Sequence, residues 1–378
     1  MSLSSEPVEI AETPLGNLLR EAEWQLNVCN SCRYCEGYCA VFPALARRSE
    51  LTHGDISHIA NVCHDCRACL TACMYAPPHE FGVNPPKILS EVRRATYDAP
   101  TLQSRPGLLG RGPTALVGFF VTVAIIVLVA LISEGTRAWL HSQHGASSPY
   151  RVISYGAVLA IGAVPFLAAA LLIARRGIAY WRHTRGPLTD LLNARAWGRA
   201  LGEAATLRYL KGGGAECNYP DDRPSPLRRH LHGWVAYGFL LCVLSTMSAA
   251  FEQDILGIHP PYPWLSVPVI SGTLGGIGIA LGCIGLIVLK TQTPDEEIDV
   301  PMRARDYALL SALLVLAVTG IAVLLSRTTS VYAPILVVHL SAVAISFLSA
   351  AYSKFAHVLY RMLALVQDNL ERAELATR

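Results

Sequence analysis

The sequence predicts an all-α protein with two parts, a soluble N-terminal domain and a bundle of six membrane-spanning helices. The 378 residues are 52% hydrophobic and only 16% charged, whereas soluble domains carry about a quarter charged residues. Six apolar segments follow residue 112, and each is close to the roughly 20 residues that a spanning helix needs. Eight of the 11 cysteines lie in two short blocks before them.

The N-terminal domain, predicted over residues 1–105, is soluble in character. Its first residues, MSLSSEPVEIAETP, are polar and acidic, with neither the basic region nor the apolar stretch of a signal peptide. We therefore expect this domain to stay in the cytoplasm with reduced thiols, rather than to form a secreted disulfide framework.

Both cysteine blocks, CNSCRYCEGYC (29–39) and CHDCRACLTAC (63–73), have the spacing C-x2-C-x2-C-x3-C. This is the spacing of bacterial ferredoxins with two [4Fe–4S] clusters, in which the fourth cysteine of each block ligates the other cluster. The prediction is cluster one on Cys29, Cys32, Cys35 and Cys73, and cluster two on Cys63, Cys66, Cys69 and Cys39.

Two zinc sites are the alternative for the same cysteines, although zinc sites more often use spaced C-x2-C pairs. The usual proline after the fourth cysteine is absent, since Ala40 follows Cys39 and Met74 follows Cys73. This change affects the local turn more than the ligation. The stretch 40–62 between the blocks is too long for a tight hairpin and has helix-like segments, so we expect a helical ferredoxin domain.

The membrane domain is predicted over residues 106–366, with a short tail at 367–378. Its expected spans are 113–132, 152–174, 233–251, 269–289, 307–325 and 332–352. The fourth span is rich in glycine, which would let a neighbouring helix or a flat cofactor approach its backbone closely.

Basic residues predict the orientation of these spans. The segment 175–230 carries eleven Lys and Arg, and the link 252–268 carries none. The positive-inside rule then places both termini and the large loop at 175–230 in the cytoplasm. Within this loop, 188–210 has helical spacing of apolar residues, so it should lie on the membrane surface or dock under the N-terminal domain. The net charge of only +3 argues against a nucleic-acid partner.

Histidines within or beside spanning segments are candidates for function. His232 and His357 both lie at predicted cytoplasmic helix ends, so they are our predicted ligand pair for a haem b. His339 lies 18 residues before His357, which on one continuous helix means the same face, about 27 Å away. One haem cannot bind both. His339 therefore either ligates a second haem or makes a hydrogen bond within the bundle.

The remaining histidines are weaker candidates. His230 is an alternative ligand to His232, on another face of the same helix. His141, His144 and His259 fall in predicted outer loops and are expected to be solvated.

Several stretches in this order, among them CNSCRYCEGYCAVFPAL, LRYLKGGGAECNYP, RRHLHGWVAYGF and YSKFAH, resemble the tricarballylate utilization protein B family, also called citrate utilization protein B. The resemblance runs from about residue 24 to 365. It implies a protein of the bacterial inner membrane with two [4Fe–4S] clusters and haem b. Electrons would come from a cytoplasmic FAD-dependent dehydrogenase that oxidises tricarballylate or a related acid, and would leave to membrane quinone. The chain would be an electron-transfer subunit rather than a stand-alone enzyme.

The helical part also resembles the gamma subunit of respiratory nitrate reductase, where two histidines 18 residues apart help to hold two haems. Lys354 and Arg361 could hydrogen-bond a quinone, or simply be charges flanking the membrane. No Gly-x-Gly-x-x-Gly follows a predicted strand, so we expect no dinucleotide site in this chain. A transporter and a redox sensor are alternative functions, but a transporter leaves the cysteines unused and a sensor lacks an output domain.

Overall fold

The computed structural model describes residues 13–98, 112–134, 149–184, 186–214 and 216–377. The described chain is mostly helical, and its one sheet is a two-stranded antiparallel ribbon. The N-terminal helices are α1 (Pro14–Cys32), α2 (Val41–Ala46), α3 (His53–Val62), α4 (Ala68–Thr71) and α5 (Pro85–Asp98). The long helices are α6 (Gly112–Glu134), α8 (Tyr155–His183), α10 (Leu227–Asp254), α11 (Val267–Thr291), α12 (Val300–Ser326) and α13 (Tyr332–Ala350). The predicted boundary near residue 105 lies outside the described residues.

The N-terminal domain folds around an apolar core formed mainly by α1, α3 and α5. Leu26, Ile56 and Leu89 are each about fully buried in it. The Thr52 hydroxyl accepts the backbone N–H of Asp55, whose carboxylate in turn accepts that of Thr52, a capping box that fixes where α3 begins. The capped helices hold the two cysteine blocks at their ends.

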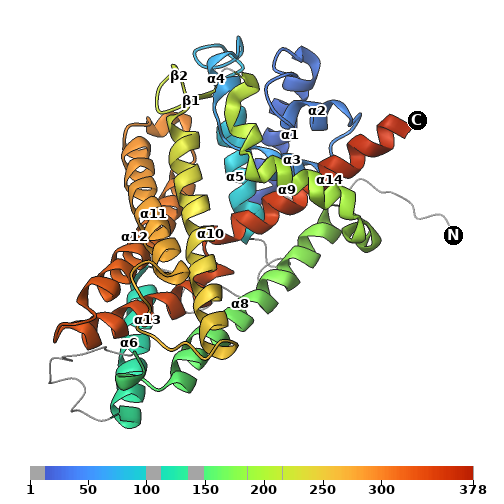
Figure 1. Cartoon of the computed structure of the whole chain (residues 1–378). Coiled ribbons are helices and arrows are strands. Elements are labelled where there is room, and N and C mark those ends of the chain that lie inside the picture. The colour runs from blue at the N-terminus through green and yellow to red at the C-terminus, as the bar shows by residue number, and fades with distance from the viewer. Residues whose placement is uncertain (1–12, 99–111, 135–148, 185, 215, 378) are drawn as a thin grey trace.

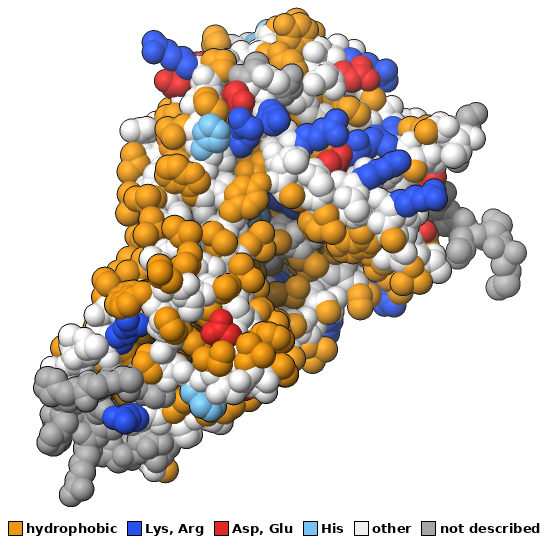
Figure 2. All heavy atoms as spheres, in the orientation of Figure 1, with side chains coloured by type: hydrophobic (Ala, Val, Ile, Leu, Met, Phe, Trp, Pro, Cys, Tyr) orange, Lys and Arg blue, Asp and Glu red, His pale blue; other side chains and the backbone are white. Residues whose placement is uncertain are grey.

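Five helices, α8, α10, α11, α12 and α13, are long and apolar enough to cross a membrane, which indicates a multi-pass membrane protein. Most of their side chains face outward, and Figure 2 shows hydrophobic side chains covering the long helices. The first predicted span coincides with α6, but its described apolar stretch, Phe120–Ala130, is shorter than a span. Five of the six predicted spans are therefore found among the described residues.

Helices α10 and α11 lie side by side because glycine lets their backbones meet (Figure 1). A Cβ atom added at Gly275 would lie 2.6 Å from the carbonyl oxygen of Gly238, and one at Gly282 would lie 2.7 Å from that of Leu231. The glycine-rich span thus packs against a helix, the first of the two uses predicted for it.

The last span ends before His357, although the prediction for His339 and His357 needed one continuous helix through both residues. Helix α13 ends at Ala350, a turn and the 3-10 helix η5 (Lys354–Ala356) follow, and α14 (His357–Thr377) then begins in another direction. The Ser353 hydroxyl accepts the N–H of Phe355 and starts the new turn. The prediction that His339 and His357 share one face of a continuous helix is therefore wrong.

Helix α14 binds the membrane part to the N-terminal domain. It packs beside α3, α8 and the loop helix α9 (Ala194–Ala205). Glu371 pairs with Arg48 at 2.7 Å and with Arg47 at 3.0 Å. Residues 367–377, predicted as a tail, continue this helix, with Asp368 and Asn369 buried.

The large loop between α8 and α10 folds onto the N-terminal domain. It contains the 3-10 helices η2 (Leu188–Leu192) and η3 (Arg208–Gly214), α9, and the strands β1 (Cys217–Asn218) and β2 (Pro224–Ser225). The carboxylate of Glu203 on α9 accepts hydrogen bonds from Asn369 and Arg372 of α14. The stretch 188–210 packs on α14 and, through Tyr209, on the ring of His64 in the N-terminal domain, which fits the docked position of the two predicted for it. Short 3-10 helices at Pro149–Arg151 (η1) and Asp295–Glu297 (η4) complete the described elements.

Candidate functional site

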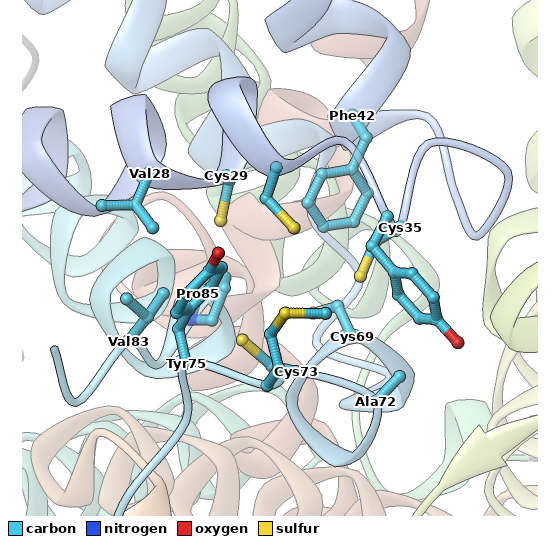
Figure 3. A pocket seen from close by; sticks show the side chains of 13 residues that line it. Val28, Cys29, Cys35, Phe42, Cys69, Ala72, Cys73, Tyr75, Val83 and Pro85 are labelled. Atoms are coloured by element: carbon cyan, nitrogen blue, oxygen red, sulfur yellow. The ribbon is translucent and has the colours of Figure 1, made fainter. Parts of the chain in front are cut away.

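The first cysteine group lines a cavity at the C-terminal end of α1. Cys29 and Cys32 come from the last turns of this helix, which ends because Arg33 adopts a left-handed conformation (φ 55°). Figure 3 shows the sulfurs of Cys29, Cys35 and Cys73 turned toward this cavity. The other lining residues are mostly apolar: Val28, Tyr34, Phe42, Cys69, Ala72, Met74, Tyr75, Val83 and Pro85.

The electrostatics of this group show which sulfurs lie together. Burial, followed by the proximity of Cys73, Cys35 and Cys32, raises the pKa of Cys29 to about 12. Burial, Cys73 and Cys32 raise the pKa of Cys35 to about 11. Four thiols so close in an apolar cavity become thiolates together only when a cationic group compensates their charge. This donor set fits an iron–sulfur cluster.

The second group, Cys39, Cys63, Cys66 and Cys69, lies deeper. Cys63 and Cys66 are buried. Burial and then Cys66 and Cys63 raise the pKa of Cys39 well above its usual range, and Cys69 is affected by the same neighbours. The structure thus brings together the two sets predicted from the spacing, in which the fourth cysteine of each block joins the other block.

The backbone of the second block points hydrogen-bond donors at its own sulfurs. Asp65 and Arg67 both have positive φ angles, 54° and 64°, which curl the chain between the cysteines. The backbone N–H of Asp65 donates to the Cys63 sulfur at 3.4 Å. Such N–H···S bonds favour a sulfur that carries negative charge, so this local geometry also fits a cluster.

Cys217 lies beside the second cysteine group. The sequence did not indicate this, because Cys217 is not part of a spaced cysteine motif. Cys217 is fully buried in β1, its thiol donates to the carbonyl oxygen of Leu210 at 3.0 Å, and its sulfur accepts a hydrogen bond from Cys66. The N–H of Asn218 donates to the carbonyl of Cys66 at 3.0 Å. The loop therefore covers the second cysteine group.

Three histidines converge beside this second group. The Nδ1–H of His357 donates to the carbonyl of Lys354 at 2.6 Å, which fixes the tautomer and leaves Nε2 as the ligand atom. Burial, and to a smaller extent the nearby Arg361, Lys354 and His232, lowers the pKa of His357 to about 3. The imidazole is therefore neutral at physiological pH.

His232 and His64 complete this cluster of histidines. The Nδ1 of His232 is buried and has no hydrogen-bond partner among the described residues. His64, inside the second cysteine block, donates its Nδ1–H to the carbonyl of Val62 at 2.8 Å. Burial and Arg361 lower the pKa of His64 well below its usual range, and His232 is among its neighbours. The sequence predicted His232 with His357 but did not indicate His64, since only tertiary folding brings it there.

The other predicted histidines lie elsewhere. The Nδ1 of His339 is 2.9 Å from the hydroxyl of Thr319 on α12, a hydrogen bond within the bundle. His230 is exposed at the start of α10, and His259 is exposed in the link before α11. His141 and His144 lie outside the described residues.

Comparison with known proteins agrees with this architecture. A family model described as Citrate utilization protein B Fer4-like domain matches residues 22–99, and one described as Citrate utilization protein B matches residues 109–378. The chain belongs to the citrate utilization protein B family. It is 39% identical to the Citrate utilization protein B of Escherichia coli over an alignment of 359 residues. This alignment covers 93% of this chain and 92% of the E. coli protein. No solved structure matches it.

Membership of the citrate utilization protein B family confirms the resemblance predicted from the sequence. The match at 22–99 gives the eight clustered cysteines a ferredoxin-like setting, and the match at 109–378 contains the apolar helices. The family thus joins an iron–sulfur domain to a membrane part in one chain.

Proposed function

We propose that this protein carries electrons from a cytoplasmic FAD-dependent dehydrogenase, through two [4Fe–4S] clusters and haem b, to membrane quinone. The observation that carries the proposal is the adjacency of two groups of residues. His64 follows the buried Cys63 of the second cysteine group in the chain, His232 is a neighbour of both His64 and His357, and these residues lie where the N-terminal domain meets the long helices. The dehydrogenase would oxidise tricarballylate or a related tricarboxylate, and the name of the E. coli relative, Citrate utilization protein B, links that protein to citrate use.

Cys29, Cys32, Cys35 and Cys73 would hold cluster one, and Cys63, Cys66, Cys69 and Cys39 would hold cluster two. When bound, the clusters and haem supply centres that each accept one electron at a time, which suits the exchange between a two-electron flavin and quinone. Zinc is less favoured, because the sulfurs form two groups of four in this particular rhythm and the family match is ferredoxin-like.

His232 and His357 would hold haem b through their imidazole nitrogens. His357 fits this role because its Nδ1–H is held by a carbonyl, as is usual for metal-binding histidines. His339 is not assigned to this haem, since it bonds Thr319.

The exposure of the two cysteine groups suggests the direction of electron flow. Tyr34 and Met74, beside the first group, are 61% and 60% exposed, whereas Cys63 and Cys66 are buried. A dehydrogenase can therefore approach the first group, and the second is closer to the histidines. The quinone would bind near His357, close to the inner leaflet.

We further propose that the protein lies in the bacterial inner membrane with both termini in the cytoplasm. Figure 2 supports this orientation, because Lys and Arg side chains gather on the part formed by the N-terminal domain, the large loop and α14.

The optical spectrum of the purified protein tests the proposal. We expect bands of a low-spin bis-histidine haem above a broad iron–sulfur absorption, with about eight non-haem irons per chain. His357→Ala should remove the haem bands and leave the non-haem iron unchanged. A wild-type protein without haem would refute the proposed route.

A further inference from the structure

Arg361 on α14 is a half-buried cation with no ion-pair partner among the described residues. Its Nε atom is buried and has no hydrogen-bond partner among the described residues, and no ion pair found in that part of the chain includes its guanidinium. Placing an unpaired charge in such a site is costly, and buried charges normally have a partner. The site therefore favours an anion that is not supplied by the described protein.

The nearby acidic side chains are already used by other cations. Asp306 pairs with Lys290 at 2.7 Å and also with Lys354. Arg228 pairs with Asp65, at 3.8 Å. Positively charged side chains thus outnumber negatively charged ones around the three histidines. Lys354 is already paired with Asp306, whereas Arg361 has no such partner among the described residues.

Arg361 lies one helical turn after His357, the predicted haem ligand, on α14. The two residues are four apart, so they lie on one face of the helix. Arg361 also bears on His64 and His357 electrostatically. Burial and the neighbouring Arg93 lower the pKa of Arg361 to about 10, against the opposing effect of Tyr97 and of Cys63, which is negative only as a thiolate. The guanidinium is still charged at neutral pH, and an anion beside it would relieve the unfavourable burial.

We propose that Arg361 binds a propionate carboxylate of the haem that His357 ligates. This inference rests on the proposed function, because it requires that haem. Arg suits the role, since its planar guanidinium binds carboxylates in a bidentate manner. A free tricarboxylate from the cytoplasm has the same chemistry, but the location of Arg361, one helical turn from the predicted haem ligand, favours the haem.

Reconstitution with two porphyrins tests the proposal. Full-length protein prepared without haem is titrated with haem and with haem dimethyl ester, whose propionates carry no charge. The wild type should bind haem about ten- to hundredfold more tightly than the ester, the range expected of a hydrogen bond between charged groups. Arg361→Gln should lose this preference, and Arg361→Lys should keep part of it. Arg182→Gln, which changes an exposed arginine of α8, is the matched control and should behave like the wild type.

The outcomes separate this inference from the proposed function. If the wild type binds neither porphyrin, the proposed function itself fails. If the wild type binds haem and Arg361→Gln keeps the full preference over the ester, only the role of Arg361 is refuted. If citrate raises the melting temperature of the haem-free wild type but not of Arg361→Gln, a free carboxylate is the ligand, which also overturns the haem assignment. Unchanged non-haem iron in each variant shows that it has folded, and Arg361→Lys keeps the test decisive should the Gln variant fail to fold.

Discussion

Cys29 and Cys73, the first and the last cysteine of the two blocks, face the same cavity. Cys73 is the cysteine that most strongly raises the pKa of Cys29, after the effect of burial. In the second group Cys39, which ends the first block, lies beside Cys66 and Cys63. Each block therefore places its last cysteine beside the sulfurs of the other block.

Serine substitutions test this arrangement. Cys73→Ser should remove cluster one, so the non-haem iron should fall from about eight to about four per chain. The electron paramagnetic resonance (EPR) spectrum of the remaining cluster should match that of Cys32→Ser. Cys39→Ser should instead match Cys66→Ser. A Cys73→Ser spectrum that matches Cys66→Ser would mean that each block ligates only its own cluster.

The hydrogen bond between His339 and Thr319 makes a second prediction. His339→Ala should keep the wild-type haem content, because its ring nitrogen is used within the bundle. It should lose roughly 1 kcal/mol of stability for the hydrogen bond, with a further loss from packing over Gly320. Thr319→Val is the matched variant and should also keep all of its haem. A haem content halved in His339→Ala alone would instead indicate a second haem at this histidine.

The sequence predicted features that depend on neighbouring residues more successfully than those that depend on tertiary contacts. The cysteine spacing implied the two sets of sulfurs that the structure brings together, because this ferredoxin rhythm is read within each block and specifies which cysteine crosses to the other one. Spans such as α11 and α12 were predicted because length and hydropathy are local properties as well.

The break between α13 and α14 was missed because every residue from Tyr332 to Arg361 is compatible with a helix. The short YSKF stretch leaves the helix through a turn and the Ser353 cap, and α14 gains burial against the N-terminal domain in exchange. His64 and Cys217 were missed for a related reason. Both reach the site through contacts between segments far apart in the chain, for which one sequence gives no signal.

The contact between α10 and α11 predicts a strong effect of Gly275→Ala. The new Cβ would meet the Gly238 carbonyl oxygen at 2.6 Å and the Cys242 sulfur at 2.8 Å, so the two helices must separate. We expect a loss of about 1–3 kcal/mol, the range typical of overpacking, measured as a lower melting temperature in detergent. Gly162→Ala on α8, where a Cβ meets nothing within 4 Å, is the control and should be close to neutral. Equal effects at both glycines would contradict this packing.

His58 predicts a dependence of stability on pH. It is fully buried in α3, and burial, aided by Arg48 and Arg47 against the opposing effect of Glu371, lowers its pKa to about 4. Its usual value in an unfolded chain is about 6.5. Between these two values the unfolded state binds the extra proton, so stability falls as the pH falls from about 6.5 to about 4 and changes no further below that.

Thermal unfolding in detergent at pH 7 and pH 5 measures this effect. The wild type should lose about 2 kcal/mol at pH 5 through His58. His58→Gln should lose correspondingly less, and His79→Gln, which changes an exposed histidine, should lose as much as the wild type. An equal loss in His58→Gln and wild type would show that other groups determine the acid sensitivity.

The contact between Cys217 and Cys66 predicts a specific effect on the second cluster. In the structure the Cys217 thiol donates to the carbonyl of Leu210 at 3.0 Å. With Cys66 bound to iron as a thiolate, we expect this proton to turn to the neighbouring Cys66 sulfur, where a hydrogen bond would stabilise the reduced, more negative cluster. Cys217→Ala should therefore keep about eight non-haem irons and lower the midpoint potential of cluster two by roughly 20–60 mV. The potential of cluster one should not change, because Cys217 lies beside only the second group. A loss of about four irons would instead identify Cys217 as a ligand, and EPR-monitored redox titration distinguishes the two outcomes.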